Sequence, residues 1–106
     1  LEQALLYVTL ACTNGSIALS CRVQGGLLAE RQTGVFIPEA MAAFQRGCAS
    51  TEQTPYVGAA CNAAGSYLFQ VGTPTSAQPV AQLLGRGCEL GDRDACHNLG
   101  VLVPRT

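Results

Sequence analysis

Apolar residues recur at helical spacing along most of the chain. Between residues 2 and 13, Ala4, Leu5, Val8 and Ala11 fall on one face of a helix. Comparable segments follow, separated by glycines, prolines and short polar runs. The pattern predicts six helices and an all-α fold, with helices over about residues 2–13, 17–31, 38–49, 55–71, 78–90 and 93–103.

Residues at the predicted helix ends agree with this division. Asn14-Gly15 ends the first helix, and Ser16, Thr54 and Asp92 are suitable N-cap residues for the second, fourth and sixth. Four further residues mark boundaries through their backbone properties: Pro38 and Pro55 at first helical positions, Gly91 as a stop and Pro104 as a barrier to continuation.

The six cysteines are spaced periodically. Cys12, Cys48 and Cys88 are 36 and 40 residues apart, and Cys21, Cys61 and Cys96 are 40 and 35 apart. A period in the mid-thirties is typical of one helical hairpin per repeat. The chain is therefore expected to form a single repeat domain of three units, about 1–33, 34–73 and 74–106, which could belong to a longer array.

Small residues follow the same period. Glycine stands four residues after each second cysteine, and a small residue precedes each first cysteine: Gly25, Gly65 and Gly100, and Ala11, Gly47 and Gly87. A glycine inside a helix costs about 1 kcal/mol relative to alanine. Its recurrence at equivalent positions predicts close contacts between helix backbones there.

The cysteines are expected to form local disulfides. In each unit the first cysteine ends one helix and the second lies one turn inside the next, so an antiparallel hairpin brings the two together. We therefore predict the pairs Cys12–Cys21, Cys48–Cys61 and Cys88–Cys96, in an oxidising compartment. The middle pair encloses twelve residues, and we expect both of its helices to be about one turn longer to accommodate them.

Three segments resemble a known family, the cysteine-rich Sel-one-like repeat, which is related to the tetratricopeptide repeat. They are "GCELGDRDACHNLGVL" at 87–102, "ACTNGSIALSCRVQGGLL" at 11–28 and "GCASTEQTPYVGAACNAAGSYL" at 47–68. The resemblance implies a right-handed α-solenoid of three disulfide-stapled antiparallel helix hairpins. It also implies a secreted or periplasmic protein that holds a peptide or protein partner on its concave face.

The first helix of each unit is expected to line that concave face. With Leu5, Val8 and their equivalents turned to the core, the adjoining face carries the candidate binding residues Tyr7, Leu10, Arg46, Leu83 and Arg86. Leu10, Arg46 and Arg86 occupy matching positions in the three units. A row of arginines there could bind carboxylates of a partner.

Composition and motifs argue against other functions. The net charge is −1 without a basic run, which disfavours nucleic acid, and no apolar run approaches the about 20 residues of a membrane span. Residues 1–10 lack the features of a signal peptide. His97 follows Cys96, but zinc spacings and the haem motif Cys-x-x-Cys-His are absent, so we expect no metal and no cofactor.

Two alternative functions remain open. The cysteine-rich branch has been linked to penicillin binding and β-lactamase activity, although a chain without lysine cannot use the Ser-x-x-Lys route. A twin-cysteine helical hairpin of the mitochondrial intermembrane space is the other, although its nine-residue spacing does not occur here. We expect no catalytic residues. The apolar last helix has two competing explanations: the chain is a fragment of a longer array, or copies pack end to end.

Overall fold

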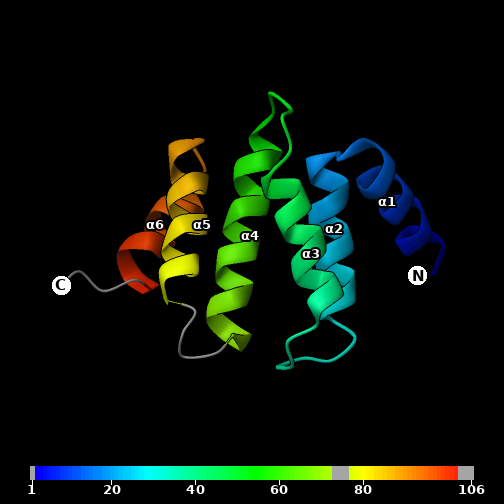
Figure 1. Ribbon diagram of the computed structural model, residues 1–106, viewed down its shortest axis with the longest axis horizontal. Helices are drawn as coiled ribbons and strands as arrows, with labels where there is room; N and C mark the ends of the chain where they lie inside the picture. Colours follow the sequence, from blue (N-terminus) through cyan, green and yellow to red (C-terminus); the bar gives the residue numbers. More distant parts are fainter. Residues whose placement is uncertain (1, 73–76, 103–106) are drawn as a thin grey trace.

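The computed structural model describes residues 2–72 and 77–102 and forms six helices in sequence (Figure 1). Their bounds are α1 Glu2–Gly15, α2 Ala18–Ala29, α3 Pro38–Cys48, α4 Pro55–Val71, α5 Ala77–Glu89 and α6 Arg93–Leu102. The predicted all-α class is confirmed. The predicted end of the last helix at Val103, the stop at Pro104 and residues 73–76 of the 72–79 connector lie outside the described residues.

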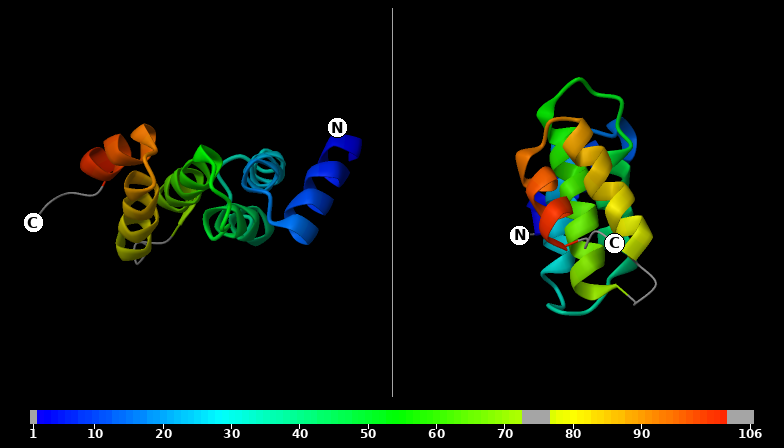
Figure 2. Two further views of the ribbon diagram at one scale, coloured as in Figure 1. Left: turned by 90° about the horizontal axis from the view of Figure 1, so that it is seen from above. Right: turned by 90° about the vertical axis from the view of Figure 1, so that its left-hand side faces the viewer.

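Successive helices pack as three hairpins, α1–α2, α3–α4 and α5–α6, and each hairpin packs on the next through α2–α3 and α4–α5. Viewed from above, α2, α4 and α6 form one layer, and α3 and α5 lie in the other (Figure 2). The second helices also contact one another, α2 with α4 and α4 with α6. Asn98 strengthens the latter contact, because its Nδ2 donates to Asn62 Oδ1 at 2.9 Å.

The core is built mainly from small and medium side chains between the layers. Met41, Phe44 and Ala64 form its central cluster, and Tyr67 packs against them. The Tyr67 hydroxyl accepts a hydrogen bond from the Ile37 N–H at 2.8 Å and donates one to the Val35 carbonyl at 3.1 Å. One aromatic side chain thus attaches the connector between the first two hairpins to the core.

The expected helix ends are partly confirmed. Pro38 and Pro55 stand at the start of their helices, and Gly91, with φ of 92°, follows the end of α5. Asp92 caps α6, because its Oδ2 accepts the Ala95 N–H at 2.9 Å. Thr54 occupies the N-cap position of α4, but its side chain makes no capping hydrogen bond.

The predicted cap at Ser16 is wrong. Ser16 has φ of 49° and donates its N–H to the Cys12 carbonyl at 2.9 Å, so it closes α1 instead of opening α2. Ile17 is the N-cap residue of α2 and offers no side-chain acceptor. The acceptor comes from the second hairpin, where Glu52 Oε1 accepts the Ala18 N–H at 2.6 Å.

The prediction that both helices of the middle hairpin are about one turn longer is correct for α4 and wrong for α3. α4 begins six residues before Cys61, whereas α2 and α6 begin three residues before their cysteines, so α4 is longer by nearly one turn. α3 is not extended and ends at Cys48. The remaining residues form the loop that carries Glu52, and this loop supplies the missing cap of the preceding hairpin.

Candidate binding surfaces

The three disulfides hold each hairpin closed at its turn. They join Cys12 to Cys21, Cys48 to Cys61 and Cys88 to Cys96, with Cα–Cα distances of 4.6, 4.4 and 4.5 Å, as predicted. All six cysteines are therefore oxidised, which supports an oxidising compartment. The first two bridges are buried, whereas Cys88 is partly buried and Cys96 is exposed.

Close packing surrounds two of the three repeated glycines. A Cβ at Gly25 would lie 2.5 Å from the Phe44 ring, and one at Gly65 would lie 2.8 Å from Leu84 Cγ. The predicted helix contact is thus confirmed in the first two hairpins. It is wrong for Gly100, where a Cβ would have no described atom within 4 Å, because none of the described helices packs on that side of α6.

The candidate binding residues fall into two rows instead of one face. Leu10, Arg46 and Arg86 form the first row, each two residues before the first cysteine of its hairpin, and all three are exposed. Tyr7 and Leu83 belong to a second row, five residues before that cysteine, which faces the preceding hairpin. Leu83 is partly buried against the core cluster, and Tyr7, with no described hairpin against it, is 72% exposed.

Both arginines contact the preceding hairpin beside its first cysteine. The Arg46 Nη1 lies 3.7 Å from Cys12 Sγ, and the Arg86 Nε donates to the Cys48 carbonyl at 3.1 Å. Each guanidinium is thus anchored beside the first cysteine of the hairpin before its own. Each anchor uses one of five N–H donors, so the remaining donors are available to a carboxylate.

Apolar side chains continue the first row on α1. Leu6 and Leu10 are 57% and 48% exposed. We define the first-helix row as Leu6, Leu10, Arg46 and Arg86. The row combines two exposed leucines on the first hairpin with one anchored arginine on each of the next two hairpins.

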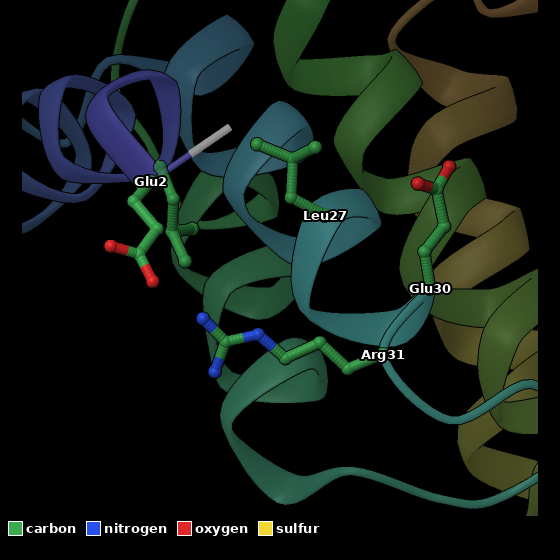
Figure 3. Close-up of a pocket in the computed structure, with 5 residues that line it drawn as sticks. Glu2, Leu27, Glu30 and Arg31 are labelled. Atoms are coloured by element: carbon green, nitrogen blue, oxygen red, sulfur yellow. The ribbon is translucent and has the colours of Figure 1, made fainter.

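A pocket of about 340 Å³ lies between the start of α1 and the end of α2 (Figure 3). Its lining residues are Glu2, Leu5, Leu27, Glu30 and Arg31. In Figure 3 Arg31 extends toward the side of Glu2, while the Glu30 carboxylate turns the other way. The described lining thus combines two carboxylates and one guanidinium with two leucine side chains.

The described residues give no other chemical centre. In this part of the chain, no three His, Cys, Asp or Glu side chains come together as metal ligands. His97 is exposed on α6, where it lines a surface pocket together with Asp92 and Asp94. None of the six helices, over their described residues, has the length and apolar character needed to cross a membrane.

The Glu52 cap is the contact that the sequence did not reveal. Its carboxylate lies 34 residues from the helix that it caps. A capping pattern is read from residues within a few positions of the helix start. The unusual length of the loop between Cys48 and Cys61 was the only sign in the sequence that this segment has an extra role. It did not show that Glu52 caps α2.

Comparisons with known proteins give no identity. No protein-family description, no curated protein and no solved structure matches this chain. The six helices, packed as sequential pairs with one disulfide in each pair, are consistent with Sel-one-like hairpin repeats.

Proposed function

We propose that the chain is a protein- or peptide-binding module of the cysteine-rich Sel-one-like kind, working as a secreted or periplasmic protein. The periodic cysteines and the local disulfides support the repeat identity. The three disulfides support an oxidising compartment, because cytosolic thiols are kept reduced. The partner lies along the first-helix row, on the face that the sequence predicts as the concave one.

The anchored arginines carry this proposal. A flexible surface arginine loses side-chain entropy when it binds a partner, whereas an anchored one has already lost part of it. Arg46 and Arg86 are held at equivalent places in successive hairpins by contacts with the preceding unit. They are therefore suited to two carboxylates of one partner segment, with Leu6 and Leu10 contacting an apolar residue beside them.

Selection from a random peptide library on the immobilised wild-type chain tests this assignment. Enriched peptides should contain acidic residues next to an apolar residue. The double variant Arg46→Gln/Arg86→Gln should bind the enriched peptides at least about tenfold more weakly, as measured by fluorescence anisotropy. Arg22→Gln is the matched control, because Arg22 is an exposed arginine on α2 in the other layer.

Two results would contradict the assignment. If the enriched peptides lacked acidic residues, the arginines would not be binding carboxylates of the partner. An equal loss of binding in Arg22→Gln would indicate a general effect of charge.

The proposal describes a binding module and not an enzyme. We therefore expect no hydrolysis of the β-lactam reporter nitrocefin above background by the purified chain. Turnover that copurifies with the wild-type chain through several columns would favour the β-lactamase-like alternative.

A further inference from the structure

The two internal junctions between hairpins have one construction. In α3 and α5, the face toward the preceding hairpin carries residues eight, five, four and one positions before the first cysteine. These residues are Ala40, Ala43, Phe44 and Gly47 in α3, and Val80, Leu83, Leu84 and Gly87 in α5. All are buried except Leu83, which is partly buried. Phe44 lies against Gly25, and Leu84 lies against Gly65.

The first helix presents the same face without a hairpin against it. Its equivalent residues are Ala4, Tyr7, Val8 and Ala11, all apolar or aromatic. Ala4 and Tyr7 are exposed, although Ala40 and Ala43 at the same positions of α3 are buried. The helix is thus one half of a junction of the internal type.

The last helix presents the other half. Gly100 corresponds to Gly25 and Gly65, and Cys96 corresponds to the buried Cys21 and Cys61, yet Gly100 and Cys96 are both exposed. No described atom lies within 4 Å of the position of a Cβ on Gly100.

From these two complementary faces we infer that copies of this chain dock head to tail, with α1 of one copy on α6 of the next. Val8 and Tyr7 of one copy cover Gly100 of the other, as Phe44 and Leu84 cover Gly25 and Gly65 within the chain. The two surfaces are different, so the contact is heterologous, and it can be repeated to give a row of copies.

This junction is weaker than the internal ones. A Cβ at Gly47 would lie 3.0 Å from Cys21 Cβ, and one at Gly87 would lie 3.0 Å from the Gly58 carbonyl oxygen. α1 has Ala11 at that position, so two copies approach less closely than two hairpins do. The receiving surface also carries the exposed Arg93 where α2 and α4 have Ala18 and Gly58. The chain is therefore monomeric when dilute and associates as its concentration rises.

Analytical ultracentrifugation of the full chain between about 10 µM and about 1 mM tests the inference, because weak contacts dissociate in that range. The mean mass of the wild type should rise with concentration. Gly100→Leu, which fills the receiving face, and Tyr7→Arg, which puts a charge on the docking face, should each stay monomeric. Gly26→Leu is the matched control, because a Cβ at Gly26 also meets nothing within 4 Å.

Mixing the two variants is the decisive measurement. Gly100→Leu keeps its docking face and Tyr7→Arg keeps its receiving face, so an equal mixture should form dimers and nothing larger. Circular dichroism of each variant at low concentration checks that it is folded.

The reduction rate of Cys88–Cys96 gives a second readout. This rate should fall at high protein concentration in the wild type and not in Gly100→Leu, because docking covers the exposed Cys96. A wild type that stays monomeric would overturn the inference and leave both faces to a hairpin of another protein. Association that survives either variant alone would also overturn it, because that result requires contacts between identical faces.

Discussion

Gly65 in α4 and Gly100 in α6 stand at the same position of their hairpins, but their surroundings differ. Leu84 fills the space over Gly65, whereas no described atom lies within 4 Å of the position of a Cβ on Gly100. The nearby disulfides differ in the same way, because Cys61 is buried and Cys96 is exposed. The repeat in the sequence therefore identifies equivalent positions in the hairpins. Whether the glycine at such a position is packed depends on the helix that follows it in the stack.

Removal of single disulfides should produce the largest difference between the two regions. Cys48→Ala/Cys61→Ala should lower the free energy of unfolding by about 3–5 kcal/mol, since it opens the longest loop. It also leaves a gap in the buried core. Cys88→Ala/Cys96→Ala should cost about 2 kcal/mol, because its loop is the shortest and its cysteines are less buried.

Guanidinium unfolding followed by circular dichroism measures both values. Equal losses in the two double variants would show that burial of the bridge does not contribute.

Alanine substitution of the glycines should change stability in opposite directions. Gly25→Ala should destabilise the fold by about 1–3 kcal/mol, because its methyl group collides with the buried Phe44 ring. Gly100→Ala should stabilise it by up to about 1 kcal/mol, since it removes helix-interior glycine entropy without a clash. Thermal unfolding at micromolar concentration, where copies do not associate, gives both values. A destabilising Gly100→Ala would mean that a side chain already covers this position.

The cysteine period was sufficient to predict the hairpins, their order and all three disulfides. The reason is physical: a cross-link across a tight turn depends on residues that are close in the sequence. The side-chain hydrogen bonds between hairpins were not predictable in the same way. The cap that Glu52 places on α2 and the backward contacts of Arg46 and Arg86 join residues 34 to 38 positions apart. Periodicity aligned the two arginines correctly, but it could not show that each one contacts the unit before its own.

α2 is capped by a residue of another hairpin, whereas α6 is capped by its own N-cap residue. Comparing the two caps tests a smaller effect on stability. Glu52→Ala should cost about 1 kcal/mol, as should Asp92→Ala, because each leaves one helix N-terminus without its acceptor. The location of the effect should differ. Hydrogen exchange should speed up at the start of α2 in the first variant and at the start of α6 in the second.

Gln53→Ala is the matched control for the loop, since Gln53 is the exposed neighbour of Glu52. Faster exchange at α2 in this control would attribute the effect to the loop and not to the carboxylate.

The smallest difference should separate the two anchored arginines. Arg86 donates to a backbone carbonyl at 3.1 Å, whereas the acceptor of Arg46 is a disulfide sulfur at 3.7 Å, which is a weak acceptor. Arg86→Gln should therefore cost about 0.5–1.5 kcal/mol. Arg46→Gln should change stability by less than about 0.5 kcal/mol, as is usual for surface substitutions. Chemical unfolding of both single variants tests this order. If Arg46→Gln were the more destabilising variant, the sulfur contact would be more important than its geometry indicates. Because both losses are small, the double variant stays folded, and a loss of peptide binding in it would then report on the partner and not on the fold.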